Sequence, residues 1–460
     1  MQNFNKIKMP QILNFRLWLV IYTLSTIILG SIARPLFPDK TLFIFQTIFI
    51  LNICIFAYIL FYKSLKRSVF FTSLFIFQIV WIAIFRIFNQ TFYGNPLGYN
   101  PLDASFYNNL GVLFSSPNYL DLSLSKLLSH YTQGMDDWGF PTIVAISYKT
   151  FGAEFGITFV AILNAVFVII GTIFIHKIAR RFTTDTNARA ICFIWATLPF
   201  SIYTSSVGLK ENYMVCFVIL SIYHLYQYME HPNLKSIILF FLFTITLLFF
   251  RTAIFFILMI TFFFTLCLTN KSFAKNVNRW LLFFAFLSFV FFSYAVDFIG
   301  GIRGDVDSST IGQQAENLIS QRSSTVVYST NILATIIGPF PSFISDPIKV
   351  NYITTYSFGT MVKMLLSIYY IYGIIYIVKH KITYFYPLLI FIALHSIMLI
   401  TTFYSLHDRY QWPQIPFVLL LSLFGFLRLK QVGKLKTKFI VGLCPLLFLA
   451  FILVYNLRLA

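Results

Sequence analysis

Long apolar stretches separated by short polar turns run along almost the whole chain. A helix needs about 20 apolar residues to cross a bilayer, and most of these stretches approach that length. The pattern predicts spans at residues 17–33, 42–62, 69–88, 156–176, 188–206, 212–229, 236–250, 252–268, 280–298, 358–378, 383–404, 414–428 and 438–457. That is about 11–13 spans, because Arg251 interrupts two short ones. We therefore predict an all-α fold, a polytopic transmembrane helical bundle.

Two long polar stretches divide the predicted bundle into regions. Residues 89–155 form a first outer loop, and residues 299–357 form a second. Residues 141–148 and 331–343 within them are apolar and aromatic, which predicts short helices in the membrane interface. The predicted regions are an N-terminal helical hairpin (1–68), a transmembrane core containing the first outer loop (69–298), the second outer loop (299–357) and C-terminal transmembrane helices (358–460).

Composition and charge support the same interpretation. The 460 residues are 58% hydrophobic and 11% charged, with a net charge of +19, whereas a soluble domain has about 25% charged residues. Threading the spans places the basic clusters on one face: Lys6/Lys8/Arg16, Lys63/Lys66/Arg67, Lys177/Arg180/Arg181/Arg189, Lys235, Lys271/Lys275/Arg279, Lys379/Lys381 and Arg428/Lys430/Lys434/Lys436/Lys438. The positive-inside rule makes this face and the N-terminus cytoplasmic. It also accounts for the charge without a nucleic-acid partner. Most acidic residues fall on the outer face, which suggests a polar working surface there.

Cysteine and histidine give little sign of metal or redox chemistry. The cysteines at positions 54, 192, 216, 267 and 444 lie in apolar stretches without a C-x-x-C pair, and four histidines fall at cytoplasmic helix ends. We expect packing roles for the cysteines, and we interpret neither these four histidines nor His395 as metal ligands. His395 is the only ionisable residue that we place deep in a span. A transporter would be expected to line a midplane cavity with such residues.

The first outer loop contains two acidic candidates. Asp103 follows an Asn-Pro turn and precedes a predicted helix, so it is either a helix N-cap or a catalytic carboxylate at the membrane surface. Asp136 and Asp137 are adjacent and favour a solvated turn. A divalent metal site there is the alternative.

Three further outer segments carry cations. Lys210 and Glu211 begin a helix, where Glu favours the helix dipole and Lys is either snorkelling or anion-binding. Arg251 interrupts an apolar run and is either a membrane-surface arginine or a functional one. Residues 407–409 read His-Asp-Arg in a short turn. That turn holds either a structural Asp–Arg pair or a phosphate-binding arginine supported by an aspartate.

The order of these features resembles the integral-membrane glycosyltransferases of the GT-C superfamily. The resemblance is to family-39-type enzymes, relatives of the protein mannosyltransferases and the lipid A aminoarabinose transferases. It spans roughly residues 75–430. Four stretches carry it: residues 102–107; residues 140–151 followed by Gly152; residues 178–182 with Leu198, Pro199 and Tyr203; and residues 407–410 with Pro413 and Pro416. Two features depart from the family pattern. Ala104 stands where a second acid often follows the first, and residues 17–62 look like an added hairpin.

The resemblance implies transfer of a sugar from a polyprenyl-phosphate carrier to a lipid, glycan or protein acceptor, with inversion. It places the enzyme in the plasma (inner) membrane with its active site on the outer face. Asp103 would be the catalytic base. Lys210, Arg251 and Arg409 would bind the donor phosphate, and Tyr107, Glu211, His407 and Asp408 would support them.

Two other functions stay open at this point. A surface-polysaccharide polymerase or ligase would use a diphosphate-linked oligosaccharide, with Arg303, Arg322 and residues 339–341 of the second loop contributing. A lipid or solute transporter is the non-enzyme alternative. The chain contains no phosphate loop and no dinucleotide fingerprint, so we predict no nucleotide cofactor. A divalent metal remains an alternative.

Overall fold

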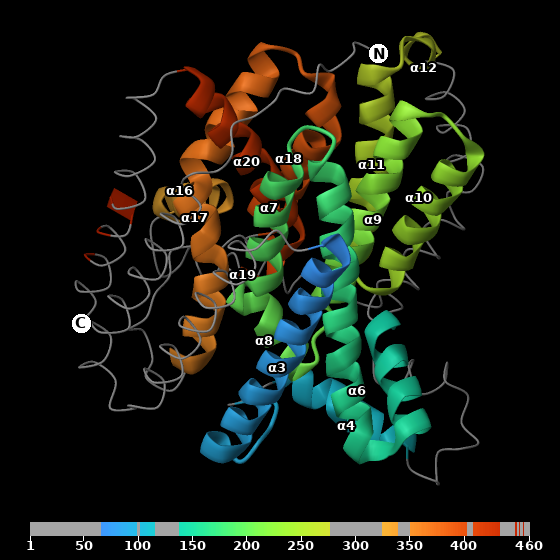
Figure 1. Ribbon diagram of the computed structural model, residues 1–460, viewed down its shortest axis with the longest axis vertical. Helices are drawn as coiled ribbons and strands as arrows, with labels where there is room; N and C mark the ends of the chain where they lie inside the picture. Colours follow the sequence, from blue (N-terminus) through green and yellow to red (C-terminus); the bar gives the residue numbers. More distant parts are fainter. Residues whose placement is uncertain are drawn as a thin grey trace.

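The computed structural model describes residues 66–98, 102–115, 138–276, 324–338, 350–402 and 408–432, with four positions between 447 and 454. Every regular element in these ranges is a helix (Figure 1). The fold class predicted from the sequence is therefore confirmed. The predicted spans 17–33, 42–62 and 280–298, and most of 438–457, lie outside the described residues, as does most of the second outer loop.

The described helices follow the predicted spans closely. In chain order they are α3 (Arg67–Tyr93), α4 (Leu102–Ser115), α6 (Gly139–Ala179), α7 (Asp185–Thr197), α8 (Pro199–Val207), α9 (Glu211–Glu230), α10 (Leu234–Thr246), η4 (Leu247–Phe249), α11 (Thr252–Thr269), α12 (Lys271–Lys275), α16 (Ser324–Ile337), α17 (Val350–Lys379), η5 (Thr383–Phe385), α18 (Tyr386–Thr401), α19 (Asp408–Gln411), η7 (Trp412–Gln414) and α20 (Ile415–Val432). Within the described ranges, six helices are long and apolar enough to cross a membrane, or seven if α7 and α8 form one bent span.

Three helix breaks have clear local causes. Gly152 adopts φ 75° and ψ 172° inside α6, so the interfacial start of this helix, predicted at residues 141–148, is separated from the spanning part. Pro199 starts α8 after α7 and the two helices bend by 45°, because proline clashes with the preceding turn. The segment predicted as a single span at 188–206 is thus divided into two helices. Arg251 is extended, at φ −168°, and separates η4 from α11.

The basic turns gather at one end of the bundle. In Figure 1 the α6–α7 turn, the α17–α18 turn and α12 lie toward the top, whereas α4 lies at the bottom. At the top end, Arg189 pairs with Asp185 at 2.6 Å, and Arg181 pairs with Glu230 at 3.2 Å. This clustering agrees with the predicted sidedness. The assignment of that end to the cytoplasm stays a prediction.

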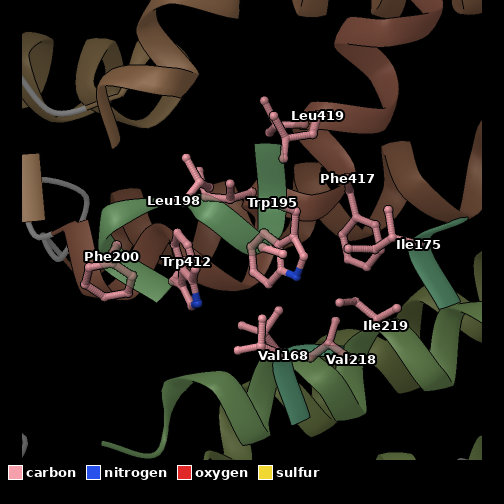
Figure 2. Packing of buried hydrophobic residues seen from close by; sticks show 14 of the residues in the cluster. Val168, Ile175, Trp195, Leu198, Phe200, Val218, Ile219, Trp412, Phe417 and Leu419 are labelled. Carbon is pink, nitrogen blue, oxygen red and sulfur yellow. The ribbon is translucent and has the colours of Figure 1, made fainter. Parts of the chain in front are cut away.

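Aromatic side chains fill the centre of the bundle. Figure 2 shows Trp412 between Trp195 and Phe200, and the two indole rings stack with centroids 4.7 Å apart. The ring of Phe200 lies 4.4 Å from that of Trp412. All three side chains are buried. The contact fixes η7, and with it the polar segment just before it, against α7 and α8.

The described interior holds ionisable side chains besides His395. His395 is buried in α18 as expected, but Lys363 is also fully buried, in the span formed by α17. Arg86 lies within the span of α3 as well, where it donates to the carbonyl oxygens of Ser206 and Ile157, both at 2.9 Å. Backbone carbonyls on neighbouring helices satisfy its guanidinium, so this charge is tolerated inside the bundle.

Candidate active site

The candidate site is built around one guanidinium that joins two carboxylates from distant parts of the chain. Arg409 in α19 donates from Nη1 to Oδ2 of Asp103 in α4, and from Nε to Oε1 of Glu211 in α9. Asp103 keeps 48% of its side chain exposed, whereas Glu211 keeps 2%. Removing one partner from a buried ion pair typically costs about 3–5 kcal/mol, so Glu211 depends on Arg409.

Close packing against α6 holds the helix that carries Asp103. Tyr148 of α6 donates its hydroxyl hydrogen bond to Asn108 of α4. A Cβ built on Gly111 of α4 would lie 2.8 Å from the Tyr148 ring, and one on Gly156 of α6 would lie 2.6 Å from it. The Tyr148 ring therefore fits between α4 and the later part of α6 only because both positions are glycine. This contact fixes where Asp103, in the first turn of α4, meets α19.

A tight turn places Lys210 and Glu211 inside the protein. Gly208 ends α8 in the left-handed region at φ 72°, a conformation that glycine adopts without steric cost. Three residues later α9 begins. Asn212 then donates to the Ser201 carbonyl at 3.0 Å and to the Ser205 hydroxyl at 2.9 Å. The start of α9 is thereby locked to α8. Lys210 is 2% exposed, which does not fit the expectation of a snorkelling lysine.

An aromatic row connects the two carboxylate helices. The ring of Tyr107 lies 4.9 Å from that of Phe140, and Phe140 lies 5.4 Å from Tyr213, both edge to face. Tyr107 follows Asp103 by one helical turn and Tyr213 follows Glu211 by two residues. Burial raises the pKa of Tyr107, so its hydroxyl stays protonated and can only donate or accept a hydrogen bond.

Arg251 reaches the same region from the break between η4 and α11. Its guanidinium carbon lies 4.8 Å from the centroid of the Tyr410 ring, a cation–π contact. Tyr410 follows Arg409 in α19. The extended backbone at Arg251 thus brings a third cation beside the segment that carries Arg409.

These charges control the ionisation of Asp103. Burial by itself raises its pKa, but the charge and hydrogen bond of Arg409 outweigh this effect, with smaller contributions from Lys210 and Arg251. The net result is a pKa below the usual value for aspartate. Asp103 is therefore ionised at neutral pH. While Arg409 holds it, Asp103 is also a weak base, because basicity falls as pKa falls.

The structure brings most of the predicted site residues together. Asp103, Tyr107, Lys210, Glu211, Arg251 and Arg409 meet around α19. The predicted catalytic and supporting roles of these residues are not tested by this proximity. His407 lies outside the described residues, as do the Asp408 side chain and the Asp136–Asp137 pair. The direct contacts of Arg409 with Asp103 and Glu211 were missed, because no local sequence pattern joins residues so far apart.

The side chains of the site could bind an anionic group and place a carboxylate base beside it. It combines three cations, Lys210, Arg251 and Arg409, with the two carboxylates. Arginine and lysine are the side chains that bind phosphate oxygens most readily. Within the described ranges no group of three His, Cys, Asp or Glu side chains could hold a metal ion.

Comparison with known proteins adds one finding. Residues 139–295 match the family model for dolichyl-phosphate-mannose-protein mannosyltransferase. The match supports a membrane glycosyltransferase of the GT-C type. The resemblance inferred from the sequence motifs is confirmed at this level. Lys210, Glu211 and Arg251 fall within the matched residues, whereas Asp103 and Arg409 lie outside them. No curated protein and no solved structure matches the chain.

Proposed function

We propose that the chain transfers a sugar from a polyprenyl-phosphate carrier to a hydroxyl of a lipid, glycan or protein acceptor on the outer face of the plasma membrane. The observation that carries this proposal is the meeting of Asp103 with Arg409, Lys210 and Arg251. A lipid-linked sugar phosphate presents an anionic leaving group next to the carbon that is attacked. The carboxylate can accept the proton of the attacking hydroxyl, and the cluster of cations can stabilise the leaving phosphate.

The proposed reaction uses Asp103 as the base and the three cations as the binding site for the leaving phosphate. Asp103 accepts the proton of the acceptor hydroxyl as the acceptor oxygen forms a bond to the anomeric carbon of the sugar. The bond from that carbon to the phosphate oxygen breaks on the opposite side, and its electron pair leaves with the lipid phosphate. Configuration at the anomeric carbon is inverted. The three cations stabilise the charge that develops on the leaving phosphate, and losing one such donor typically costs about 10²–10³ in rate.

Binding of the donor changes the strength of the base in this mechanism. The donor phosphate competes with Asp103 for the guanidinium of Arg409. Once that guanidinium turns to the phosphate, Asp103 loses the interaction that lowers its pKa, and the added negative charge raises its pKa further. Asp103 becomes a stronger base only when donor is in place. Glu211 keeps Arg409 anchored throughout, because it is buried and bonds the Nε side of the guanidinium.

Lipid profiling in cells tests the proposal. Cells lacking the protein are complemented with wild type, Asp103→Asn or the matched control Asp185→Asn, which changes an aspartate at the opposite end of the bundle. Polyprenyl carriers are then measured by mass spectrometry. We expect a monosaccharide on polyprenyl phosphate to build up in the null and with Asp103→Asn, and to clear with wild type and Asp185→Asn.

Other outcomes of this experiment decide between functions. Accumulation of a diphosphate-linked oligosaccharide would identify a polymerase or ligase instead. An unchanged set of carriers would contradict the enzyme proposal and favour transport. Normal clearance by Asp103→Asn would remove Asp103 from the role of base. Membrane abundance of each variant is measured alongside, so that loss of protein is not mistaken for loss of activity.

A further inference from the structure

Among the described residues, the proposed reaction leaves one fully buried lysine without a role. Lys363 lies in α17 with 0% of its side chain exposed. Its Nζ donates to the carbonyl oxygen of Thr335 at 2.5 Å and to the side-chain oxygen of Gln411 at 2.8 Å. Both acceptors are uncharged. An ionisable side chain inside a membrane-spanning segment is by default a candidate for a functional role.

Gln411 is held from both ends of its amide. Its oxygen accepts from Lys363, and its Nε2 donates to the carbonyl oxygen of Ala334 at 2.8 Å. Gln411 is the last residue of α19, a helix of four residues that also contains Arg409. Because α19 is a single turn, holding Gln411 fixes the rotation of the whole helix, and therefore the direction in which Arg409 extends.

The support for Gln411 is itself firmly packed. Ala334 and Thr335 belong to α16, and Asn331 of the same helix donates to the carbonyl oxygen of Ile400 in α18 at 2.7 Å. Asn331 and Thr335 are both buried. α16 is thus bound to α18, so the hydrogen bonds from Lys363 and Gln411 attach α19 to an anchored helix.

We propose that Lys363 is a positioning residue for Arg409. By holding the Gln411 amide against α16, Lys363 sets α19 so that the Arg409 guanidinium reaches both Asp103 and Glu211. The orientation of Arg409 is a property of the fold, and its effect on turnover rests on the proposed function. The same hydrogen bonds join α16, a part of the second outer loop, to the candidate active site.

A double-mutant cycle in thermal stability tests the orientation without any assay of activity. Melting temperatures of purified wild type, Lys363→Met, Glu211→Gln and the double variant are compared in one detergent. If Lys363 directs Arg409 toward Glu211, the loss in the double variant is smaller than the sum of the single losses. The control pairs Glu211→Gln with Thr261→Val, which removes a buried hydroxyl of α11 that bonds within its own helix. In that control pair, the two losses in melting temperature should add. Additive losses for Lys363 and Glu211 would overturn the proposal.

A kinetic cycle then asks whether Lys363 acts through Arg409. We expect Lys363→Met to lower kcat by about 10–100-fold, the scale of a misplacement of about 1 Å, with the acceptor KM unchanged. In the Arg409→Lys background, Lys363→Met should lower kcat by less than about threefold, because the residue through which Lys363 acts is already altered. If the double variant loses kcat by the product of the two separate losses, the proposal is contradicted.

A second substitution covers the case in which Lys363→Met does not fold. Gln411→Met interrupts the same chain of hydrogen bonds one step nearer to Arg409, and should reproduce the loss of kcat and the coupling to Glu211. Full activity of Gln411→Met would overturn the proposal. If wild type transfers no sugar from a polyprenyl-phosphate donor, the proposed function fails, while the stability cycle still decides the role of Lys363.

Discussion

At the scale of single residues, Asp103 shows how the chemistry depends on its neighbours. Read alone, it is one acidic residue after an Asn-Pro turn, where a helix N-cap is the first interpretation and a catalytic carboxylate the alternative. In the structure it lies in the first turn of α4 and accepts a hydrogen bond from Arg409, which holds its pKa below the usual value. In the proposed mechanism, Asp103 is therefore a weaker base in the free protein than in the complex with donor.

This difference predicts how the rate depends on pH. The pH profile of kcat/KM for the donor reports groups in the free enzyme, whereas that of kcat reports the complex. Because the pKa of Asp103 is lowered in the free protein, kcat/KM should fall only at a pH below the range in which an ordinary aspartate titrates. If Arg409 turns to the donor phosphate as proposed, the pKa of Asp103 rises in the complex, and the fall in kcat should begin at a higher pH.

Steady-state rates between pH 4 and 8 check this prediction. Asp103→Glu is the useful comparison, because it keeps a carboxylate on a longer side chain. Identical acid limbs in kcat and kcat/KM would show that donor binding leaves the base unchanged, contrary to the mechanism.

At the scale of elements, short breaks and close contacts determine which helices meet. Gly152, Pro199 and Arg251 each mark a break between neighbouring helical segments. The sequence predicted the helices on either side of these breaks well, because apolar length and periodicity are local properties. The bend of 45° between α7 and α8 was missed, since the apolar run continues through Pro199 without a polar gap.

The crossing of α17 and α20 gives a prediction at this scale. A Cβ added to Gly425 would lie 2.0 Å from the carbonyl oxygen of Tyr369, a backbone atom, whereas one on Gly171 would lie 3.2 Å from the end of the Ile219 side chain. We expect Gly425→Ala to separate the two helices and to destabilise the protein by about 1–3 kcal/mol, with a clear fall in melting temperature. Gly171→Ala is the control, because a flexible side-chain end can move.

Melting in detergent with parallel measurement of abundance tests the pair. Equal melting temperatures for Gly425→Ala and Gly171→Ala would show that the α17–α20 contact is looser than the structure indicates. Because Lys363 lies on α17, Gly425→Ala should also lower transfer activity.

At the scale of the whole molecule, the sidedness of the bundle leads to a topology prediction. The basic turns lie at one end and the candidate site lies away from them (Figure 1). We place the site on the outer face. Lys149→Cys, in the exposed interfacial part of α6, should react with a membrane-impermeant thiol reagent in intact cells. Lys235→Cys, exposed at the start of α10, should react only after the membrane is permeabilised.

Wild type serves as the background in this labelling experiment because, of the described native cysteines, Cys192 and Cys216 are buried but Cys267 is partly exposed. Labelling of Lys235→Cys in intact cells, with protection of Lys149→Cys, would reverse the orientation and move the proposed reaction to the cytoplasmic face.

Apolar length and charge in the sequence determined that this protein is a helical membrane bundle. The order of its motifs indicated a likeness to the GT-C glycosyltransferases and selected Asp103, Lys210, Arg251 and Arg409 as site candidates. These properties are local or additive, so they can be recognised without knowing which helices touch. Tertiary structure alone decided that Arg409 pairs with Asp103 and Glu211, and that Lys363 supports it through Gln411. Those contacts join residues far apart in the chain, and packing between helices creates them.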